Sequence, residues 1–214
     1  MCYENLILEN HRCLKISQNG RFLASETKCG IGLYNLVIQK CIGFIDLNNK
    51  EVFAVAWSTD GDKFAVLCGK MLKNLSPFIE RIWDNKEVRI YKVYEDGYKY
   101  INTIYAENYP QEILIDIIIS NNNLVTIAYN KIDIPSRIIK VWNMQSKCIK
   151  TVSQILNKNI MPNCLFSPDG KMLAISNDYN INVILLDNYD DNYNFFHNID
   201  PLKFVKNILF CTNN

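Results

Sequence analysis

The stretch "CLFSPDGKMLAISNDYNINVILLD" (residues 164–187) decides the fold of this chain. It reads as a short apolar strand, a serine, a polar turn containing Asp-Gly, and two further apolar strands. Asp and Gly tolerate the positive φ angles of tight hairpin turns, so Asp169 and Gly170 predict a hairpin. The segment therefore predicts consecutive antiparallel strands.

The same order of strand, serine, turn and strand occurs four times. The marker serines are Ser17, Ser58, Ser120 and Ser167, and their spacings are 41, 62 and 47 residues. A repeat at this interval indicates one supersecondary unit used several times. The four copies are "CLKISQNGRFLAS" (13–25), "VAWSTDGDKFAVL" (55–67), "IIISNNNLVTIA" (117–128) and "CLFSPDGKMLAIS" (164–176).

A second pattern gives the same units independently. The segments "KCIGFI" (40–45), "KYINTI" (99–104) and "KCIKTV" (147–152) share a Lys, a Cys or Tyr, an Ile and a final Ile or Val. Each follows a strand whose end carries an aromatic residue, and these residues are Tyr34, Tyr91 and Trp142. Each unit is therefore predicted to contain four short strands in a meander.

Units of this length and content resemble the WD-repeat β-propellers, in which each repeat forms one blade. The resemblance is strongest at 164–187, which is similar to the family pattern of Ser-Pro-Asp-Gly followed by Leu-Ala and a closing Asp. It implies an all-β fold, a WD-type β-propeller of about four four-stranded blades plus a partial fifth. We expect a single domain over 1–214, with blades at about 4–36, 40–93, 98–143 and 147–187, and a partial blade at 193–211.

The chain departs from the family in two ways. No repeat has the Gly-His pair that precedes the first strand, and Lys28, Ser136 and Asn180 replace the Asp of the turn after the second strand. The Asp-His-Ser/Thr-Trp hydrogen-bond network of the family therefore cannot form here as a complete set. A partial fifth blade also leaves three alternatives open, namely closure of a small ring, completion by another chain, or a fragment of a larger ancestor.

Composition argues against catalysis and against metal or cofactor binding. The chain has 214 residues, a net charge of +1, two histidines and eight cysteines without a C-x-x-C pair. Zinc sites and nucleophilic triads need clustered His, Cys and carboxylate groups, so we expect no metal, no cofactor and no catalytic residues. The near-zero charge disfavours nucleic acid. We expect no membrane partner and a cytoplasmic or nuclear location with free thiols.

Interaction surfaces in such a fold are expected in unusual loops. The segment 69–85 supplies most of the extra length between Ser58 and Ser120, and it holds Trp and Arg, residue types enriched at interface hot spots. A second loop, 130–136, is expected on the same face. The residues predicted to bind a partner are Lys70, Lys73, Phe78, Arg81, Trp83, Lys131 and Ile132.

Two interpretations of 69–85 remain open. It forms a partner-binding surface, or it simply lengthens a hairpin whose aromatic residues pack on their own blade. The Trp83-Asp84 pair looks like a strand-closing marker, but the spacing to Ser120 fits Tyr91 better, so Tyr91 is predicted to end the strand.

The sequence thus predicts a non-catalytic scaffold for protein–protein interaction. An alternative is a self-associating structural subunit completed by pairing of an edge strand with another chain. A third hypothesis is an enzyme or ligand-binding propeller with its site in the central channel. A polar, charged channel mouth would favour it, and an apolar, plugged channel would count against it.

Overall fold

The chain forms β-strands and turns throughout the residues that its structure, a computed structural model, describes. Those residues are 14–28, 30–71, 83–105, 112–130, 136–155, 163–176, 180–186 and 194–198. Their strands form four antiparallel sheets of four strands each. The predicted all-β class is confirmed.

In every sheet the strands pair in chain order, so each sheet is a meander. Sheet 1 contains β1 (Leu14–Ile16), β2 (Phe22–Glu26), β3 (Gly30–Asn35) and β4 (Lys40–Asp46). Sheet 2 contains β5 (Glu51–Trp57), β6 (Lys63–Met71), β7 (Trp83–Val93) and β8 (Tyr98–Tyr105). Sheet 3 contains β9 (Glu112–Ile119), β10 (Asn123–Asn130), β11 (Ser136–Asn143) and β12 (Cys148–Ile155). Sheet 4 contains β13 (Asn163–Phe166), β14 (Met172–Ser176), β15 (Asn180–Leu185) and β16 (Asn194–Asn198).

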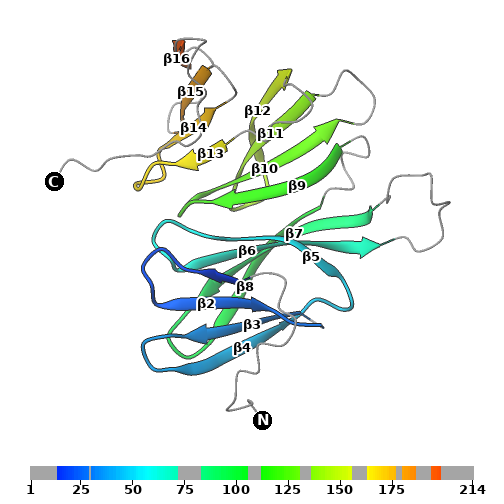
Figure 1. Cartoon of the computed structure of the whole chain (residues 1–214), viewed down its shortest axis with the longest axis vertical. Coiled ribbons are helices and arrows are strands. Elements are labelled where there is room, and N and C mark those ends of the chain that lie inside the picture. Colours follow the sequence, from blue (N-terminus) through cyan, green and yellow to red (C-terminus); the bar gives the residue numbers. More distant parts are fainter. Residues whose placement is uncertain are drawn as a thin grey trace.

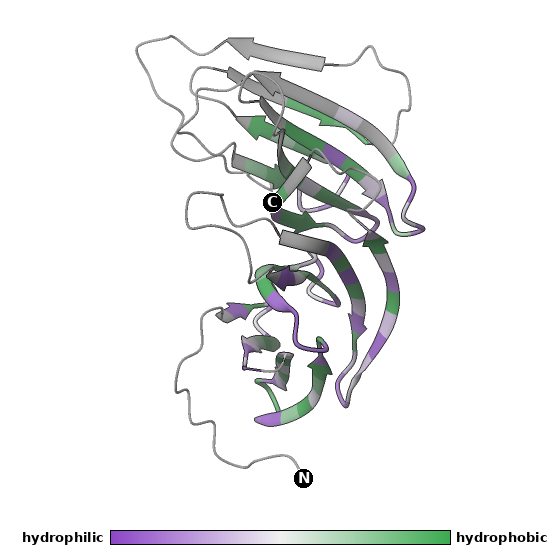
Figure 2. Ribbon diagram, turned by 90° about the vertical axis from the view of Figure 1, so that its right-hand side faces the viewer, coloured by the Kyte–Doolittle hydropathy of each residue, from purple (hydrophilic) through white to green (hydrophobic). Residues whose placement is uncertain are grey.

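The four sheets follow one another along a curved row, with sheet 1 and sheet 4 at opposite ends (Figures 1 and 2). The first strands of neighbouring sheets contact each other, β1 with β5, β5 with β9, and β9 with β13. These first strands therefore lie along the inner side of the curve, where a propeller has its axis.

The middle sheets bury both of their faces. In β6, Phe64 and Val66 pack toward sheet 1, whereas Ala65 and Leu67 pack toward sheet 3, and all four are fully buried. Successive side chains of a strand point to opposite faces, so a strand between two sheets must be apolar at every position. This requirement explains the continuous apolar runs that the sequence shows in its second strands.

The marker serines have the same role in all four sheets. Each is buried, and its hydroxyl oxygen accepts a hydrogen bond from the backbone N–H at or next to the start of the second strand. The glycines of three of the turns, Gly20, Gly61 and Gly170, have φ angles of 72°, 77° and 71°. The predicted hairpins are confirmed. The four donor residues are Phe22, Lys63, Asn123 and Met172.

The sheets do not share the predicted unit boundaries. The segment 40–46 was expected to open the second unit, but it is the fourth strand of sheet 1 and pairs with β3. The units 40–93, 98–143 and 147–187 are displaced by one strand in the same way, and 194–198 completes sheet 4 rather than a fifth blade. In the first three sheets the cause is the tight turn after the third strand, which returns the chain onto the strand that it has just left. Residues 4–13 and 199–211 lie outside the described part.

Candidate functional site

In each of the first three sheets the predicted aromatic residue lies one or two residues before the end of the third strand. In sheet 1 the pairing of β3 with β4 shifts by one residue at Tyr34, which lies opposite Cys41. The corresponding pairs with the same shift are Tyr91–Tyr100 in sheet 2 and Trp142–Cys148 in sheet 3. Tyr91 is therefore the marker of its sheet, as the spacing predicted.

Trp83 occupies the opposite end of the same strand. It is the first residue of β7 and pairs with Met71, while Asp84 pairs with Lys70. The two ends of the 69–85 segment thus lengthen the β6–β7 hairpin. This agrees with the interpretation that the segment extends a hairpin.

Only part of the predicted partner site falls within the described residues. Lys70 is exposed at the end of β6. The strand pairing with Met71 places the backbone of Trp83, and the side chain of Trp83 is not among those that the structure describes. The other predicted site residues, Lys73, Phe78, Arg81, Lys131 and Ile132, lie outside the described residues.

The strands that lead into the two predicted loops run to the same side of the molecule. β6 ends at Met71 and β10 ends at Asn130, and both strands point to the right in Figure 1. The two connections therefore begin from the same side of neighbouring sheets, which is the arrangement that a shared ridge needs.

A charged cluster lies at the base of the lengthened hairpin. Glu87 is nearly buried and forms ion pairs with Lys50, at 2.7 Å, and with Arg89. Arg89 also donates to the carbonyl oxygen of Asp46, at 3.2 Å, which ties sheet 2 to sheet 1. Burial opposes the ionisation of Glu87, but its hydrogen bonds with Lys50 and Arg89 outweigh burial and hold its pKa below the ordinary value.

The neighbouring residue Lys86 points to the other side of the sheet. Its ammonium nitrogen donates to the carbonyl oxygen of Leu114 in sheet 3, at 2.7 Å, and lies 4.8 Å from the centre of the Phe53 ring. Lys86 and Glu87 together join the base of the hairpin to both adjacent sheets. The lengthened hairpin therefore rises from a firmly held base.

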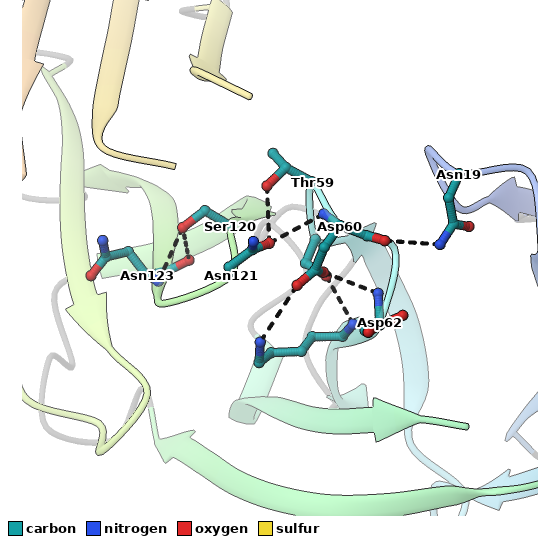
Figure 3. Close-up of polar contacts among 9 residues, drawn as sticks. Asn19, Thr59, Asp60, Asp62, Ser120, Asn121 and Asn123 are labelled. Atoms are coloured by element: carbon teal, nitrogen blue, oxygen red, sulfur yellow. Dashed lines mark hydrogen bonds and ion pairs between the residues drawn. The ribbon is translucent and has the colours of Figure 1, made fainter. Parts of the chain in front are cut away.

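At the end of the sheets opposite to the lengthened hairpin, hydrogen bonds join the first turns, which are the turns between the first and second strands of neighbouring sheets (Figure 3). Asn19 Nδ2 donates to the carbonyl oxygen of Asp60, at 2.8 Å, and links sheet 1 to sheet 2. Asn121 Oδ1 accepts from the Thr59 hydroxyl, at 3.0 Å, and from the Asp60 backbone N–H, at 3.1 Å, which links sheet 2 to sheet 3. Sequence reasoning treated these asparagines only as turn residues.

Beside these turns, the first strands of all four sheets surround a pocket of about 230 Å³. We call it the axial pocket. Its polar lining consists of Lys15, Gln18 and Thr59. This lining offers few convergent titratable groups of the kind that a catalytic centre needs, so it does not favour the enzymatic form of the third hypothesis. The apolar and sulfur-bearing lining residues are Ile16, Ala56, Trp57, Ile117, Ile118, Ile119, Cys164, Leu165 and Phe166.

The described cysteines are poor nucleophiles where they are buried. Burial, reinforced by the charge of Glu87, raises the pKa of Cys68 to about 12. Burial, reinforced by Asp116, raises the pKa of Cys164 to about 12 as well. Such thiols stay protonated at neutral pH, and the thiolate is the reactive form.

Metal-ligand clusters and membrane-spanning helices are both absent from the part of the chain that the structure describes. No group of three or more His, Cys, Asp or Glu side chains there is placed to hold a metal ion. The same residues contain no helix of the length and apolarity needed to cross a membrane.

One hydrogen bond joins an aromatic marker to a second-strand hydroxyl in sheet 3. The indole N–H of Trp142 donates to the hydroxyl of Thr126, at 2.9 Å, between the third and second strands. Both side chains are buried. The aromatic marker therefore has a hydrogen-bonding role as well as a packing role.

Comparison with known proteins shows the fold. No protein-family model and no curated protein sequence matches the chain. Among solved structures, the β-propeller domain of Cps50 (Swd1) from Myceliophteria thermophila is similar, with a TM-score of 0.51, 13% identity, and 89% of this chain and 55% of that chain covered. The tricorn protease is similar too, with a TM-score of 0.51, 12% identity, and 90% of this chain and 24% of that chain covered.

These likenesses and the four meander sheets together show that the fold is that of a β-propeller. The chain spans about half the length of the first of these structures and about a quarter of the second. Because the sequence identities are this low, the two likenesses show the fold and nothing further.

Proposed function

We propose that this chain is a non-catalytic protein-interaction module built on a WD-repeat-like propeller. The Thr126–Trp142 hydrogen bond and the shared strand-end register support the WD-type relationship. The proposed partners are other proteins, bound without a cofactor in the cytoplasm or the nucleus, and neither a membrane nor nucleic acid is the main partner.

The observation that carries the proposal is the lengthened β6–β7 hairpin. In sheet 1 the pairing of the second and third strands ends at Glu26 with Ile31. In sheet 2 the corresponding pairing continues past Cys68 to Met71 with Trp83. Sheet 1 forms the same meander without this extra length, so the added residues of the β6–β7 hairpin are available to bind a partner.

The composition of this insertion fits an interface. Phe78, Arg81 and Trp83 are of the types enriched where partner proteins bind. Lys70 and Lys73 add positive charge, which would guide an acidic partner surface. Lys131 and Ile132 follow β10, which runs to the same side, and are proposed to extend the surface.

Affinity purification with quantitative mass spectrometry tests the proposal. Arg81→Ala with Trp83→Ala is expected to lose the specific partners of the wild-type chain. Tyr105→Ala is the matched control, because Tyr105 is exposed to 54% on β8 and outside the insertion. If the double variant retains every partner that Tyr105→Ala retains, the insertion is not the binding surface.

A second candidate is a self-associating subunit completed through edge strands. The outer strands β4 and β8 are sheet edges and carry exposed aromatic residues, Phe44 at 44% and Tyr100 at 51%. Exposed edges favour pairing with another chain. Sedimentation of the wild-type chain and of Tyr100→Lys tests this candidate, since a monomer at all concentrations contradicts it.

A further inference from the structure

The turn between β3 and β4 exposes three consecutive aliphatic side chains. Leu36 is exposed to 38%, Val37 to 68% and Ile38 to 49%. We call these three residues the aliphatic turn. Runs of exposed apolar residues are unfavourable in a soluble protein unless a partner covers them.

The conformation of this turn does not require aliphatic side chains. The side-chain oxygen of Asn35 accepts from the backbone N–H groups of Val37, at 3.0 Å, and Ile38, at 3.3 Å, and Gln39 has a φ of 54°. An asparagine at the strand end and a left-handed residue before the next strand therefore define the turn.

Sheet 3 builds a similar turn, one residue shorter, in which Met144 is the single apolar residue between Asn143 and Lys147. There the side-chain oxygen of Asn143 accepts from the backbone N–H of Gln145, at 3.0 Å, and Ser146 has a φ of 65°. Gln145 thus occupies the position that Val37 has in sheet 1. A polar residue is thus compatible with the turn at the position of Val37, so the exposed aliphatic side chain there has no evident role in the turn itself.

The axial pocket is complementary to the aliphatic turn in chemistry and size. Its lining is mainly apolar, and Ile16 on that lining is exposed to 61%. A dry apolar cavity of about 150 Å³ is large enough to take up benzene. The pocket of about 230 Å³ therefore has room for one or two aliphatic side chains.

The turn and the pocket lie at the same end of the sheets. β1 runs into the first turn, and β3 runs parallel to β1 and into the aliphatic turn, because alternate strands of a meander share a direction. Gln18 and Thr59, which belong to the first turns of sheets 1 and 2, line the pocket. A partner approaching this end meets both features.

We propose that two copies of this chain associate through this end, with the aliphatic turn of each copy inserted into the axial pocket of the other. A two-fold axis satisfies both insertions at once, so the contact closes as a dimer. The lengthened β6–β7 hairpin is at the other end of the sheets and stays free. The dimer therefore does not depend on the proposed partner surface.

Sedimentation equilibrium of the full chain over a range of concentrations tests the dimer. The wild-type chain is expected to show a reversible monomer–dimer equilibrium. Val37→Gln is expected to weaken the association at least about tenfold, or about 1.4 kcal/mol. The unfolding midpoint of Val37→Gln should stay unchanged, because sheet 3 carries Gln at this position. Tyr105→Gln, the matched control, should dimerise like the wild type.

Mixing two variants tests the insertion itself. Ile16→Lys places a charge at the pocket and should abolish dimerisation while keeping the aliphatic turn. A mixture of Ile16→Lys and Val37→Gln regains one intact turn and one intact pocket, so it should associate more tightly than either variant alone. A monomeric wild-type chain, a Val37→Gln variant that dimerises normally, or a mixture no tighter than its components would each overturn the proposal.

Discussion

The Thr126–Trp142 hydrogen bond is expected to contribute measurably to stability. Thr126→Val keeps the shape of the side chain and removes the acceptor, 2.9 Å from the indole nitrogen. Both residues are buried, with exposures of 1% and 6%. Loss of a buried acceptor costs about 1–3 kcal/mol, and the added methyl group offsets part of this, so we expect a loss of about 1–2 kcal/mol. For a domain of this size the unfolding midpoint should fall by roughly 3–6 °C.

A double-mutant cycle measured by urea unfolding separates the hydrogen bond from other effects. In the Trp142→Phe background, Thr126→Val should cost little, which gives a coupling energy of about 1 kcal/mol. Thr103→Val, which alters a hydroxyl on the outer strand β8, serves as the control. Equal costs of Thr126→Val in both backgrounds would refute the role assigned to this contact.

Three further outcomes follow from the packing and the electrostatics. Gly43→Ala should destabilise the protein by about 1–3 kcal/mol in urea unfolding, because the new Cβ would lie 2.5 Å from the Tyr98 ring; an unchanged midpoint would contradict this packing. Glu87 has a lowered pKa, so its contribution is present at neutral pH and is lost as the pH falls below its ordinary 4.5 and through its folded value. Glu87→Gln should flatten the acid side of the stability curve, and an equally steep acid loss would argue against the Lys50–Glu87–Arg89 cluster. At neutral pH, Cys68, which is fully buried and has a pKa of about 12, should react with a thiolate-directed reagent more slowly than the partly buried Cys41, as read by peptide mapping; equal rates would contradict the burial of Cys68.

Local patterns in the sequence were sufficient to predict the hairpins. A buried serine followed by a short polar turn recurs in all four sheets, and its hydrogen bond to the second strand is a local interaction. The aromatic strand ends at Tyr34, Tyr91 and Trp142 were predictable for the same reason, because a tight turn and a register shift follow each of them.

Contacts between distant residues were not predictable in this way. The assignment of 40–46 to sheet 1 depends on which neighbour a strand pairs with, and four successive strands of similar composition leave that choice open. The links from Asn121 to Thr59 and Asp60 join turns about sixty residues apart in sequence, as their separations of 62 and 61 show. No local pattern marks them.

The candidate site was predictable only in its location. Extra length between Ser58 and Ser120 indicated the insertion, and the structure places its two ends on β6 and β7. The aliphatic turn was not singled out from the sequence, because three apolar residues beside a strand carry no local mark of their exposure. Exposure on the surface, which only the tertiary structure shows, distinguishes them.

Replacement of residues 72–82 by a short Asn-Gly turn tests the central claim most directly. The pairing of Lys70 with Asp84 and of Met71 with Trp83 already brings the two strands together, so a tight turn can join them. The proposed function predicts that this variant unfolds at nearly the same temperature as the wild type but loses its protein partners in affinity purification. Recovery of the full set of partners by a correctly folded variant would contradict the claim that this insertion is the interaction surface.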